Sequence, residues 1–318
     1  MSMNNTPVQD QTQPITYVGI DIAKDSFQYH FSPKLQGSLP NEPAGFKRLL
    51  RLLGEQPVHL VCEATGGYEQ PLVVFCLGHQ LPVSIVDPAR VHHFIKGKGQ
   101  RAKTDKIDAA MLALFGAENV PDPVAPLSPE QRHLRELSRR RDQLMEIRQC
   151  LANQSRGLTL KPLLSDQRKL TREFDRQITR IEEHMEKLIS DSEHLRALQA
   201  LLLKEPAVGP VLSRTLLAEM PELGRLNRST APALAGVAPY ARDSGNHKGR
   251  RFIGGGRPQI RKKLYMAALV ASRHHPRLKG IYEHLIKRGK PAKVALTALM
   301  RHLIIQLNHN LKNHPKPS

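Results

Sequence analysis

Short hydrophobic runs alternate with polar, helix-patterned stretches through the first part of the chain. The runs are bounded by polar segments, and one of them alternates apolar and polar residues as a hairpin strand would. The predicted elements, in order, are strands at 17–22 and 27–31, a helix at 44–53, a strand at 58–62, a helix at 70–79 and a strand at 83–86. Strands that alternate with helices in this way predict an α/β layered domain.

The stretch from 128 to 203 has a different pattern that is long, charged and rich in helix formers. Its apolar residues are spaced by four and three or by seven, which is the heptad repeat of a coiled coil. The positions are Leu137, Leu144 and Leu151, followed by Phe174, Ile178, Ile181, Met185 and Leu188. We expect two long helices that pair as an antiparallel or an intersubunit coiled coil. Two interpretations stay open: a dimerisation arm, or a helical hairpin packed on its own domain.

A third region begins at residue 204 with a glycine-containing turn, followed by an apolar helix near 212–220. This arrangement is typical of a helix-hairpin-helix element, in which the amides at the start of the second helix can face a phosphate. The signal is weak by itself, because many helical hairpins turn at a glycine. The whole pattern divides the chain into a disordered leader at 1–16 and three domains at 17–127, 128–203 and 204–318.

Composition and charge extend the picture from the fold to the partner. The chain has 318 residues, of which 40% are hydrophobic, enough for about two globular domains with cores. Lys and Arg number 48 against 29 Asp and Glu, a formal net charge of +19, which predicts a polyanionic partner such as nucleic acid. A ribosomal-type or simply basic protein is the alternative. Aromatic residues make up 4%, which argues against extended stacking surfaces for single-stranded bases.

Cysteine usage and hydropathy bear on the compartment. Cys62, Cys76 and Cys150 lack metal-ligand spacing and predict small, buried side chains in a reducing environment. The leader has no apolar signal core, and no apolar run reaches the roughly 20 residues that span a bilayer. We therefore expect a cytoplasmic, nucleoid-associated protein that makes no membrane contact.

Four carboxylates occupy positions that are typical of a metal site. Asp21 and Glu63 each end a predicted strand, at the sheet edge where ligands gather in open α/β sheets. Asp105 and Asp108 open an apolar helix at 109–115, and their i, i+3 spacing puts both on one face. Carboxylate oxygens are hard ligands that suit Mg²⁺. Two such ions roughly 4 Å apart can stabilise both the attacking and the leaving oxygen of a phosphoryl transfer.

Taken singly, each of these acids has an ordinary structural explanation. An Asp after a strand often forms a turn, and an acid in a first helical turn often only interacts with the helix dipole. The set of four favours a metal site, because converging carboxylates repel one another unless cations lie between them. Asp25, Glu69 and Asp87 lie nearby, but a cap or a turn explains each of them.

A basic, glycine-rich segment at 238–257 forms the second candidate site. Glycines let a backbone approach a phosphate closely, and Arg and Lys side chains bind it. Ser244, between Asp243 and Gly245, is either a nucleophile activated by a metal or a base, or an ordinary turn residue of a phosphate-binding loop. The predicted nucleic-acid-binding residues are Arg242, Lys248, Arg250, Arg251, Arg257, Arg261, Lys262 and Lys263.

These motifs resemble those of a known family, in the same order along the chain. YVGIDIAK at 17–24, CEATGGY at 62–68 and KTDKIDA at 103–109 are similar to signatures of the DEDD transposases of the insertion-sequence-110 family. LAGVAP at 234–239, DSG at 243–245 and LYMAALVA at 264–271 are similar to that family's C-terminal transposase domain. The resemblance spans nearly the whole chain after the leader.

The resemblance implies a fold, a chemistry and partners. It implies a RuvC-like (RNase H-like) N-terminal domain, in which Asp21, Glu63, Asp105 and Asp108 bind two Mg²⁺ ions. It implies that Ser244 is the nucleophile that forms a covalent phosphoserine link to double-stranded DNA. Subunits of the family form dimers that assemble into tetramers, in which the acids of one subunit meet the serine of another. Family members also use a non-coding bridge RNA that pairs with target and donor DNA.

One segment departs from the family pattern, and several functions stay open. Many relatives carry Ser-Lys-x-Gly after the serine, where this chain has GGGR at 254–257. The main hypothesis is a transposase that excises and integrates its own element, and the alternative within the family is a site-specific DNA invertase. A RuvC-like junction-resolving nuclease would need the four acids but not Ser244. A non-enzymatic nucleic-acid binder would need neither.

Overall fold

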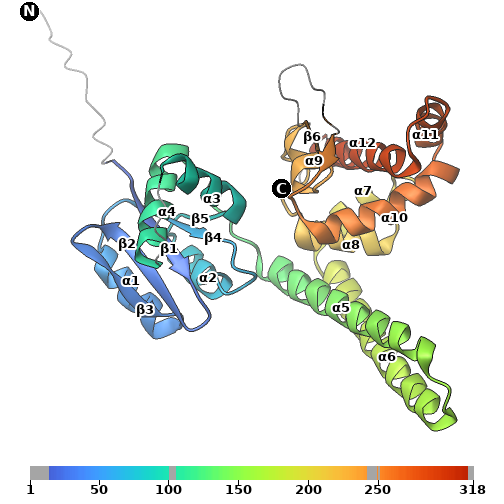
Figure 1. The fold of residues 1–318 in the computed structure, drawn as a ribbon, viewed down its shortest axis with the longest axis horizontal. Coiled ribbons are helices and arrows are strands. Elements are labelled where there is room, and N and C mark those ends of the chain that lie inside the picture. Colours follow the sequence, from blue (N-terminus) through green and yellow to red (C-terminus); the bar gives the residue numbers. More distant parts are fainter. Residues whose placement is uncertain (1–13, 100–104, 242–248, 250, 314–318) are drawn as a thin grey trace, which may run out of the picture. The chain divides into compact units, whose positions relative to one another are not determined.

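The structure is a computed structural model that describes residues 14–99, 105–241, 249 and 251–313, with the backbone alone at Asp105 and Lys106. It divides into two compact units, Met1–Pro126 and Leu127–Ser318 (Figure 1). No helix within the described ranges combines the length and the apolar character that crossing a membrane requires.

The N-terminal unit is built on a five-stranded sheet in the order β3-β2-β1-β4-β5. β1 (Thr16–Ile22), β2 (Ser26–Ser32) and β3 (Leu35–Pro40) form an antiparallel meander. β4 (Val58–Glu63) pairs parallel with β1, and β5 (Val83–Val86) pairs parallel with β4. The predicted α/β domain is therefore confirmed. The pattern of apolar positions missed β3, because most of its side chains are exposed or half-buried.

Four helices accompany the sheet. They are α1 (Pro43–Leu53), α2 (Gln70–Gly78), α3 (Pro88–Gly97) and α4 (Asp105–Asn119). α1 packs against β3 and α2, and α2 also contacts β5. α4 packs against β1, β2 and β4, and α3 packs against α4. Helix α3 was not predicted, and it begins at a Pro that follows the capping Asp87.

Alternating side chains of β1 and β4 serve two separate cores. Val18, Ile20 and Leu60 belong to one core with residues of α1 and α2, whereas Val61 belongs to another with residues of α3 and α4. Gly19 allows α4 to approach β1 closely, since a side chain there would collide with the helix backbone. The period-two pattern thus fixes which residues of each strand face α4.

Two long helices form an antiparallel hairpin in the C-terminal unit (Figure 1). α5 (Pro129–Gln154) and α6 (Lys161–Asp191) are joined through the 3-10 turn η1 (Ser155–Gly157). Ser128 begins α5 with a capping box: its hydroxyl accepts from the amide of Gln131, whose side chain accepts from the amide of Ser128. Capping of this kind satisfies backbone amides that the first helical turn leaves unpaired.

Predicted heptad positions lie between these two helices. Leu144, Ile178 and Met185 are buried, and Nε of Arg148 lies 2.5 Å from Oδ1 of Asp175 across the hairpin. The pairing of two long helices within one chain is therefore present. The coiled-coil assembly arm stays a prediction.

The rest of the C-terminal unit is mostly helical and shares one core with the base of the hairpin. Its helices are α7 (Glu193–Leu203), α8 (Pro210–Glu219), α9 (Thr230–Leu234), α10 (Pro258–His274), α11 (Leu278–Lys287) and α12 (Ala292–Lys312). β6 (Pro239–Tyr240) and β7 (Phe252–Ile253) form a short ribbon. Leu134 of α5 and Met185 of α6 join Leu264 and Leu303 in this core. The hairpin base is therefore part of the same compact unit.

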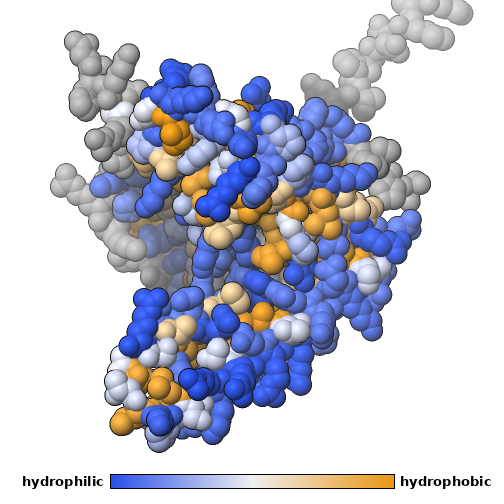
Figure 2. All heavy atoms as spheres, turned by 90° about the vertical axis from the view of Figure 1, so that its right-hand side faces the viewer, coloured by the Kyte–Doolittle hydropathy of each residue, from blue (hydrophilic) through white to orange (hydrophobic). Residues whose placement is uncertain are grey.

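On the face drawn in Figure 2, hydrophilic side chains predominate and small groups of apolar side chains lie between them. Exposed apolar residues of the hairpin are Met145, Ile147, Leu160, Leu163 and Leu170. Cys62 and Cys76 are buried, as predicted, but Cys150 is exposed, so the prediction was wrong for it. A helical hairpin buries only the positions that face the partner helix, and Cys150 does not face it.

Candidate functional site

The two strand-end acids lie side by side at the carboxyl edge of the sheet. Asp21 is the last residue but one of β1, and Glu63 is the last residue of β4. These strands are parallel, and Ile20 pairs with Cys62, so the next step of the register sets Asp21 beside Glu63. Parallel pairing of neighbouring strands thus brings together two acids that are far apart in the sequence.

Both acids also lie on the face of the sheet that α4 covers. A side chain at Gly19 would collide with the backbone of Ala109 in α4, and Val61 shares a core with α4. Side chains two residues apart in a strand share a face. Asp21 therefore lies on the same face as Gly19, and Glu63 on the same face as Val61. We call this region, the ends of β1 and β4 on the α4 face, the acidic edge.

The direction of α4 brings its first turn to the acidic edge. Gly19 of β1 lies against Ala109, whereas Tyr17 lies against Gly116 at the other end of the helix. The helix therefore runs antiparallel to β1, and the end of β1 points toward the start of α4. Asp108, which is half-buried, lies in that first turn. The fold thus carries a third predicted acid to the same end of the sheet.

The acidic edge has the ligand chemistry of a divalent-metal site. Asp21, Glu63 and Asp108 supply hard oxygen ligands, and the backbone of Asp105 lies in the same turn, while its side chain is outside the described part. Among the side chains that the structure describes, no three His, Cys, Asp or Glu form a group that could hold a metal ion. Carboxylates without a cation between them repel one another. The donor types and their placement fit Mg²⁺, whereas the described side chains do not close a ligand cage.

Asn41, between β3 and α1, ties together the two loops that follow the acids. Its Nδ2 donates to the carbonyl oxygen of Ala23, after β1, at 3.0 Å and to that of Tyr68, after β4, at 3.1 Å. Its backbone N–H donates to the carbonyl oxygen of Asp25 at 3.0 Å. No sequence signal points to this role, because an Asn before a helix is usually a turn residue.

Glu69 organises the loop after β4 from inside. It is buried, and its Oε2 accepts from the amides of Thr65 at 3.1 Å and Gly67 at 2.9 Å and from the Thr65 hydroxyl at 2.8 Å. Burial alone would raise the pKa of Glu69, but hydrogen bonds, led by that from Gln70, outweigh it and hold the pKa below its usual value. Glu69 therefore has a turn role, and Asp87 caps α3 through two backbone amides.

The basic segment is only partly described. Ser244, Arg242, Lys248 and Arg250 lie outside the described residues. The described ends of the segment are held together by the β6–β7 ribbon, in which Tyr240 pairs with Phe252. The nucleophilic role of Ser244 therefore stays a prediction.

Three of the predicted phosphate-binding cations have partners within the protein. Nζ of Lys263 lies 2.5 Å from Asp142 with 13% of its side chain exposed, and Nη1 of Arg257 lies 2.5 Å from Glu222. Nη1 of Arg261 donates to the carbonyl oxygens of Gly236 and Gly255. Burial lowers the pKa of Lys263, although Asp142 opposes this effect. These three side chains thus hold the glycine-rich region and α10 in place.

Two other predicted cations reach solvent. Arg251 is exposed, and the side chain of Lys262 is 70% exposed, with Glu146 at 3.8 Å. Among the described members of the predicted set, Arg251 and Lys262 are therefore the ones placed to contact a phosphate from solvent.

A turn between α7 and α8 occupies the predicted helix-hairpin-helix position. Gly209 is the N-cap of α8, Pro210 is its first residue, and Ala207 has a positive φ of 73°. Nothing lies within 4 Å of the place where a Cβ would sit on Gly209. Phosphate binding at the start of α8 stays a prediction.

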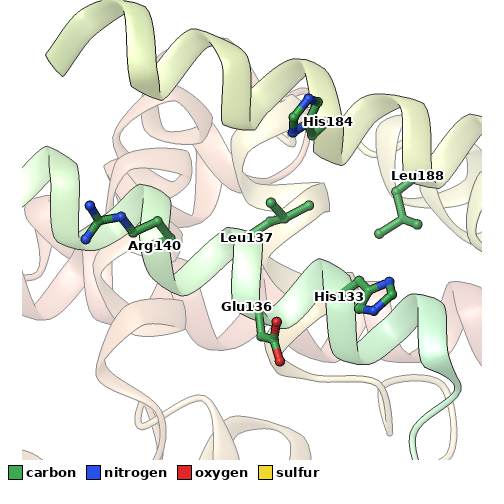
Figure 3. Close-up of a pocket in the computed structure, with 6 residues that line it drawn as sticks. All are labelled: His133, Glu136, Leu137, Arg140, His184 and Leu188. Carbon is green, nitrogen blue, oxygen red and sulfur yellow. The ribbon is translucent and has the colours of Figure 1, made fainter. Parts of the chain in front are cut away.

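The C-terminal unit also contains an open cavity of about 390 Å³ between α5 and α6 (Figure 3). Leu137 and Leu188 lie between the two helices, and polar side chains surround them. The polar lining residues are His133, Glu136, Arg140 and His184. None of the predicted site residues that the structure describes lines this cavity.

Comparison with known proteins identifies the family. A family model described as a transposase matches residues 18–163, and a second, described as the transposase IS116/IS110/IS902 family, matches residues 199–283. The chain is a member of the IS110 family of transposases. The first match contains all four predicted acids, and the second contains Ser244. Transposases of this DEDD class generally depend on divalent metal ions.

Individual relatives agree with this family. The pilin gene-inverting protein of Moraxella bovis is 28% identical over 303 residues, which are 91% of this chain and 93% of the relative. The protein of the same name from Moraxella lacunata has the same identity and coverage. The transposase for insertion sequence element IS1328 of Yersinia enterocolitica is 28% identical over 149 residues, 46% of this chain and 43% of the relative. This chain is accordingly a transposase-type DNA recombinase.

Proposed function

We propose that this transposase cuts and rejoins DNA strands by metal-dependent phosphoryl transfer at the acidic edge of a RuvC-like N-terminal domain. The observation that carries the proposal is the parallel register of β1 and β4, which sets Asp21 beside Glu63 on the face covered by α4. The start of α4 adds Asp108 and the backbone of Asp105 at the same end.

These four acids would hold the divalent cations. When bound, such cations stabilise the charge on the attacking and leaving oxygens of the phosphoryl group. Asn41 and Glu69 hold the loops beside Asp21 and Glu63 through hydrogen bonds, which limits the reordering that binding requires. Exposed cations of the C-terminal unit, such as Arg251 and Lys262, would contact phosphates of the DNA.

We propose Ser244 as the nucleophile. Its Oγ attacks the phosphorus of one strand, the bond from phosphorus to a deoxyribose oxygen breaks, and the serine proton ends on that leaving oxygen. In rejoining, a deoxyribose hydroxyl of the second DNA end attacks the phosphoserine, and Ser244 leaves as a hydroxyl. This assignment is supported by the second family match, which contains Ser244.

The proposed partners are double-stranded DNA, namely the element ends and the target, and a non-coding bridge RNA that pairs with both. The formal net charge of +19 supports polyanionic partners in general. The proposed assembly is a homo-oligomer, a dimer or a tetramer, in which the hairpin of α5 and α6 serves as the assembly arm. The acids of one subunit then meet Ser244 of another.

Site-specific DNA inversion is the second candidate function. It is favoured by two relatives named pilin gene-inverting proteins, which match over 93% of their length. Inversion and transposition share cutting and rejoining, and they differ in where the two DNA sites lie. The DNA that flanks the gene distinguishes them, because a transposase gene lies within its own mobile element.

A covalent trapping experiment tests the mechanism. We expect DNA with one labelled strand to become covalently attached to the wild-type protein in Mg²⁺, and not to the Ser244→Ala variant. Ser229→Ala is the matched control, because Ser229 is an exposed serine of the same unit. If Ser244→Ala cuts DNA at the wild-type rate without attachment, the protein is a hydrolytic nuclease and the phosphoserine step is wrong.

A further inference from the structure

Tyr68 is the most exposed aromatic side chain among the described residues of the N-terminal unit. Half of it, 50%, is accessible to solvent, whereas Phe27, Phe46 and Phe115 are buried in the cores. It lies in the loop between β4 and α2, five residues after Glu63. Exposing so large an apolar ring costs free energy that burial would recover. An exposed aromatic ring beside a candidate active site is therefore a candidate contact for a bound molecule.

The loop that carries Tyr68 is fixed at both ends. Asn41 donates to the carbonyl oxygen of Tyr68 at 3.1 Å, and the next residue, Glu69, is buried and accepts hydrogen bonds from Thr65 and Gly67. A loop with this many internal hydrogen bonds loses little conformational entropy when its exposed side chain binds a partner. These hydrogen bonds hold the loop in one conformation with the Tyr68 ring in solvent, so the loop need not become ordered when the ring binds a partner.

The same hydrogen bonds bring the backbone of Tyr68 close to the loop that follows Asp21. Through Asn41, the backbone of Tyr68 is tied to Ala23, two residues after Asp21. Ala23 is followed directly by the exposed Lys24. An aromatic ring beside a cation is the combination that single nucleotides of a DNA strand bind, through the base and the phosphate respectively.

We infer that Tyr68 is a stacking platform for one nucleobase of the DNA strand that lies at the acidic edge, with Lys24 beside it for a phosphate. This inference rests on the proposed function, because cleavage at the acidic edge requires a DNA strand there. A single platform agrees with the low aromatic content of 4%, which argues only against long stacking surfaces. It predicts that the strand is unpaired and unstacked next to the cleavage point, since neighbouring base pairs cover both faces of a base within a duplex.

Binding to a forked duplex tests the stacking. The full-length protein is titrated, without divalent metal so that no cutting occurs, with a labelled duplex that ends in two oligothymidine arms. Stacking contributes about 1–3 kcal/mol per base, so we expect Tyr68→Ala to weaken binding by at least about fivefold and at most about 150-fold. Tyr68→Phe keeps the ring and should stay within about twofold of wild type.

An arm without bases separates stacking from phosphate contact. The same fork with abasic arms keeps every phosphate but offers no base to stack. We expect the wild type to lose affinity for it by the same factor as Tyr68→Ala, and the two changes together to cost no more than either alone. If Tyr68→Ala weakens binding equally on both forks, the ring contacts the backbone or a protein surface, and the inference is wrong.

The absence of tryptophan from the sequence gives an optical test. A Tyr68→Trp variant has a single tryptophan, whose emission should fall when the ring stacks on a thymine arm and stay unchanged with the abasic fork. Leu114→Trp on α4, where the side chain is 39% exposed, is the matched control and should not respond. Anisotropy of the labelled DNA reports binding independently of either tryptophan.

The outcomes for the platform and for the proposed function are distinguishable. If DNA binds, Asp21→Asn abolishes strand cleavage and the Tyr68→Trp emission does not change, only the platform is rejected. If Asp21→Asn cuts DNA like the wild type, the proposed function fails whatever Tyr68 does.

Discussion

The acidic edge of the N-terminal unit and the basic, glycine-rich region of the C-terminal unit use charge in opposite ways. At the acidic edge, like charges are brought to one place by strand register and by one close helix contact at Gly19. In the basic region, several cations are neutralised within the protein, as Lys263 is by Asp142. The tertiary placement of each charge, and not its presence in the sequence, therefore separates a candidate site for counterions from an internal ion pair.

Removing one acid should have the largest effect. We expect Asp21→Asn or Glu63→Gln to slow strand cleavage by at least about a hundredfold, because loss of a ligand should exceed the 10- to 100-fold typical of outer-shell partners. DNA affinity in metal-free buffer should change little. Cleavage of a labelled DNA substrate measures the effect. Asp25→Asn is the control, since the structure uses the backbone of Asp25, and equal losses in Asp21→Asn and Asp25→Asn would contradict the metal role.

Lys262 and Lys263, which are neighbours in α10, should differ in how much each contributes to the stability of the fold. Lys263→Ala leaves Asp142 buried with less compensation, so we expect the free energy of unfolding to fall by about 3 kcal/mol. Lys262→Ala removes a side chain that is 70% exposed and should change stability by less than about 0.5 kcal/mol. Urea unfolding followed by circular dichroism measures both.

DNA binding gives the reverse order for the same pair of lysines. Lys262→Ala should weaken DNA binding and reduce its salt dependence by about one phosphate contact. Binding measured between roughly 50 and 200 mM salt tests this. If Lys262→Ala and Lys263→Ala shifted stability equally, the division between internal and external cations would be wrong.

Closing the space between α4 and β1 should destabilise the N-terminal unit. In Gly19→Ala the new methyl group collides with the backbone of Ala109 and Ala113, and we expect a loss of about 1–3 kcal/mol in the free energy of unfolding. The displaced start of α4 should also slow cleavage. Gly78→Ala, where nothing lies within 4 Å of the added carbon, is the control and should be as stable as wild type or slightly more so.

The smallest effect concerns pH. The pKa of Glu69 is held below its usual value in the folded protein. Its contribution to stability is therefore fully present above the unfolded-state pKa of about 4.3 and is lost as pH falls through the folded pKa. The wild type should lose stability toward acid pH more steeply than Glu69→Gln. Glu55→Gln, at an exposed position, should follow the wild-type curve of stability against pH. If stability falls with pH as steeply in Glu69→Gln as in the wild type, Glu69 does not make this contribution.

Much of the N-terminal fold could be predicted because its strands are short apolar runs between polar segments. Strands β1, β2, β4 and β5 and the helices α1 and α2 lie at or within one or two residues of the predicted ranges. β3 could not be predicted, because an edge strand with exposed side chains has no periodic apolar signal. The roles of Asn41 and Lys263 could not be predicted either, because each depends on a partner far away in the sequence.

The sequence by itself determined the residue types, the net charge and the motifs of the family, because these need no knowledge of what lies next to what. The tertiary structure alone decided that Asp21 stands beside Glu63 and that the first turn of α4 lies at the same end of the sheet. It also decided that Lys263 is buried against Asp142, whereas Lys262 is 70% exposed. The physical reason is that electrostatic and hydrogen-bonding roles depend on distance and burial. The pairing of strands and the packing of helices set both the distance and the burial. They do so between residues that are far apart in the sequence, which a local sequence pattern does not encode.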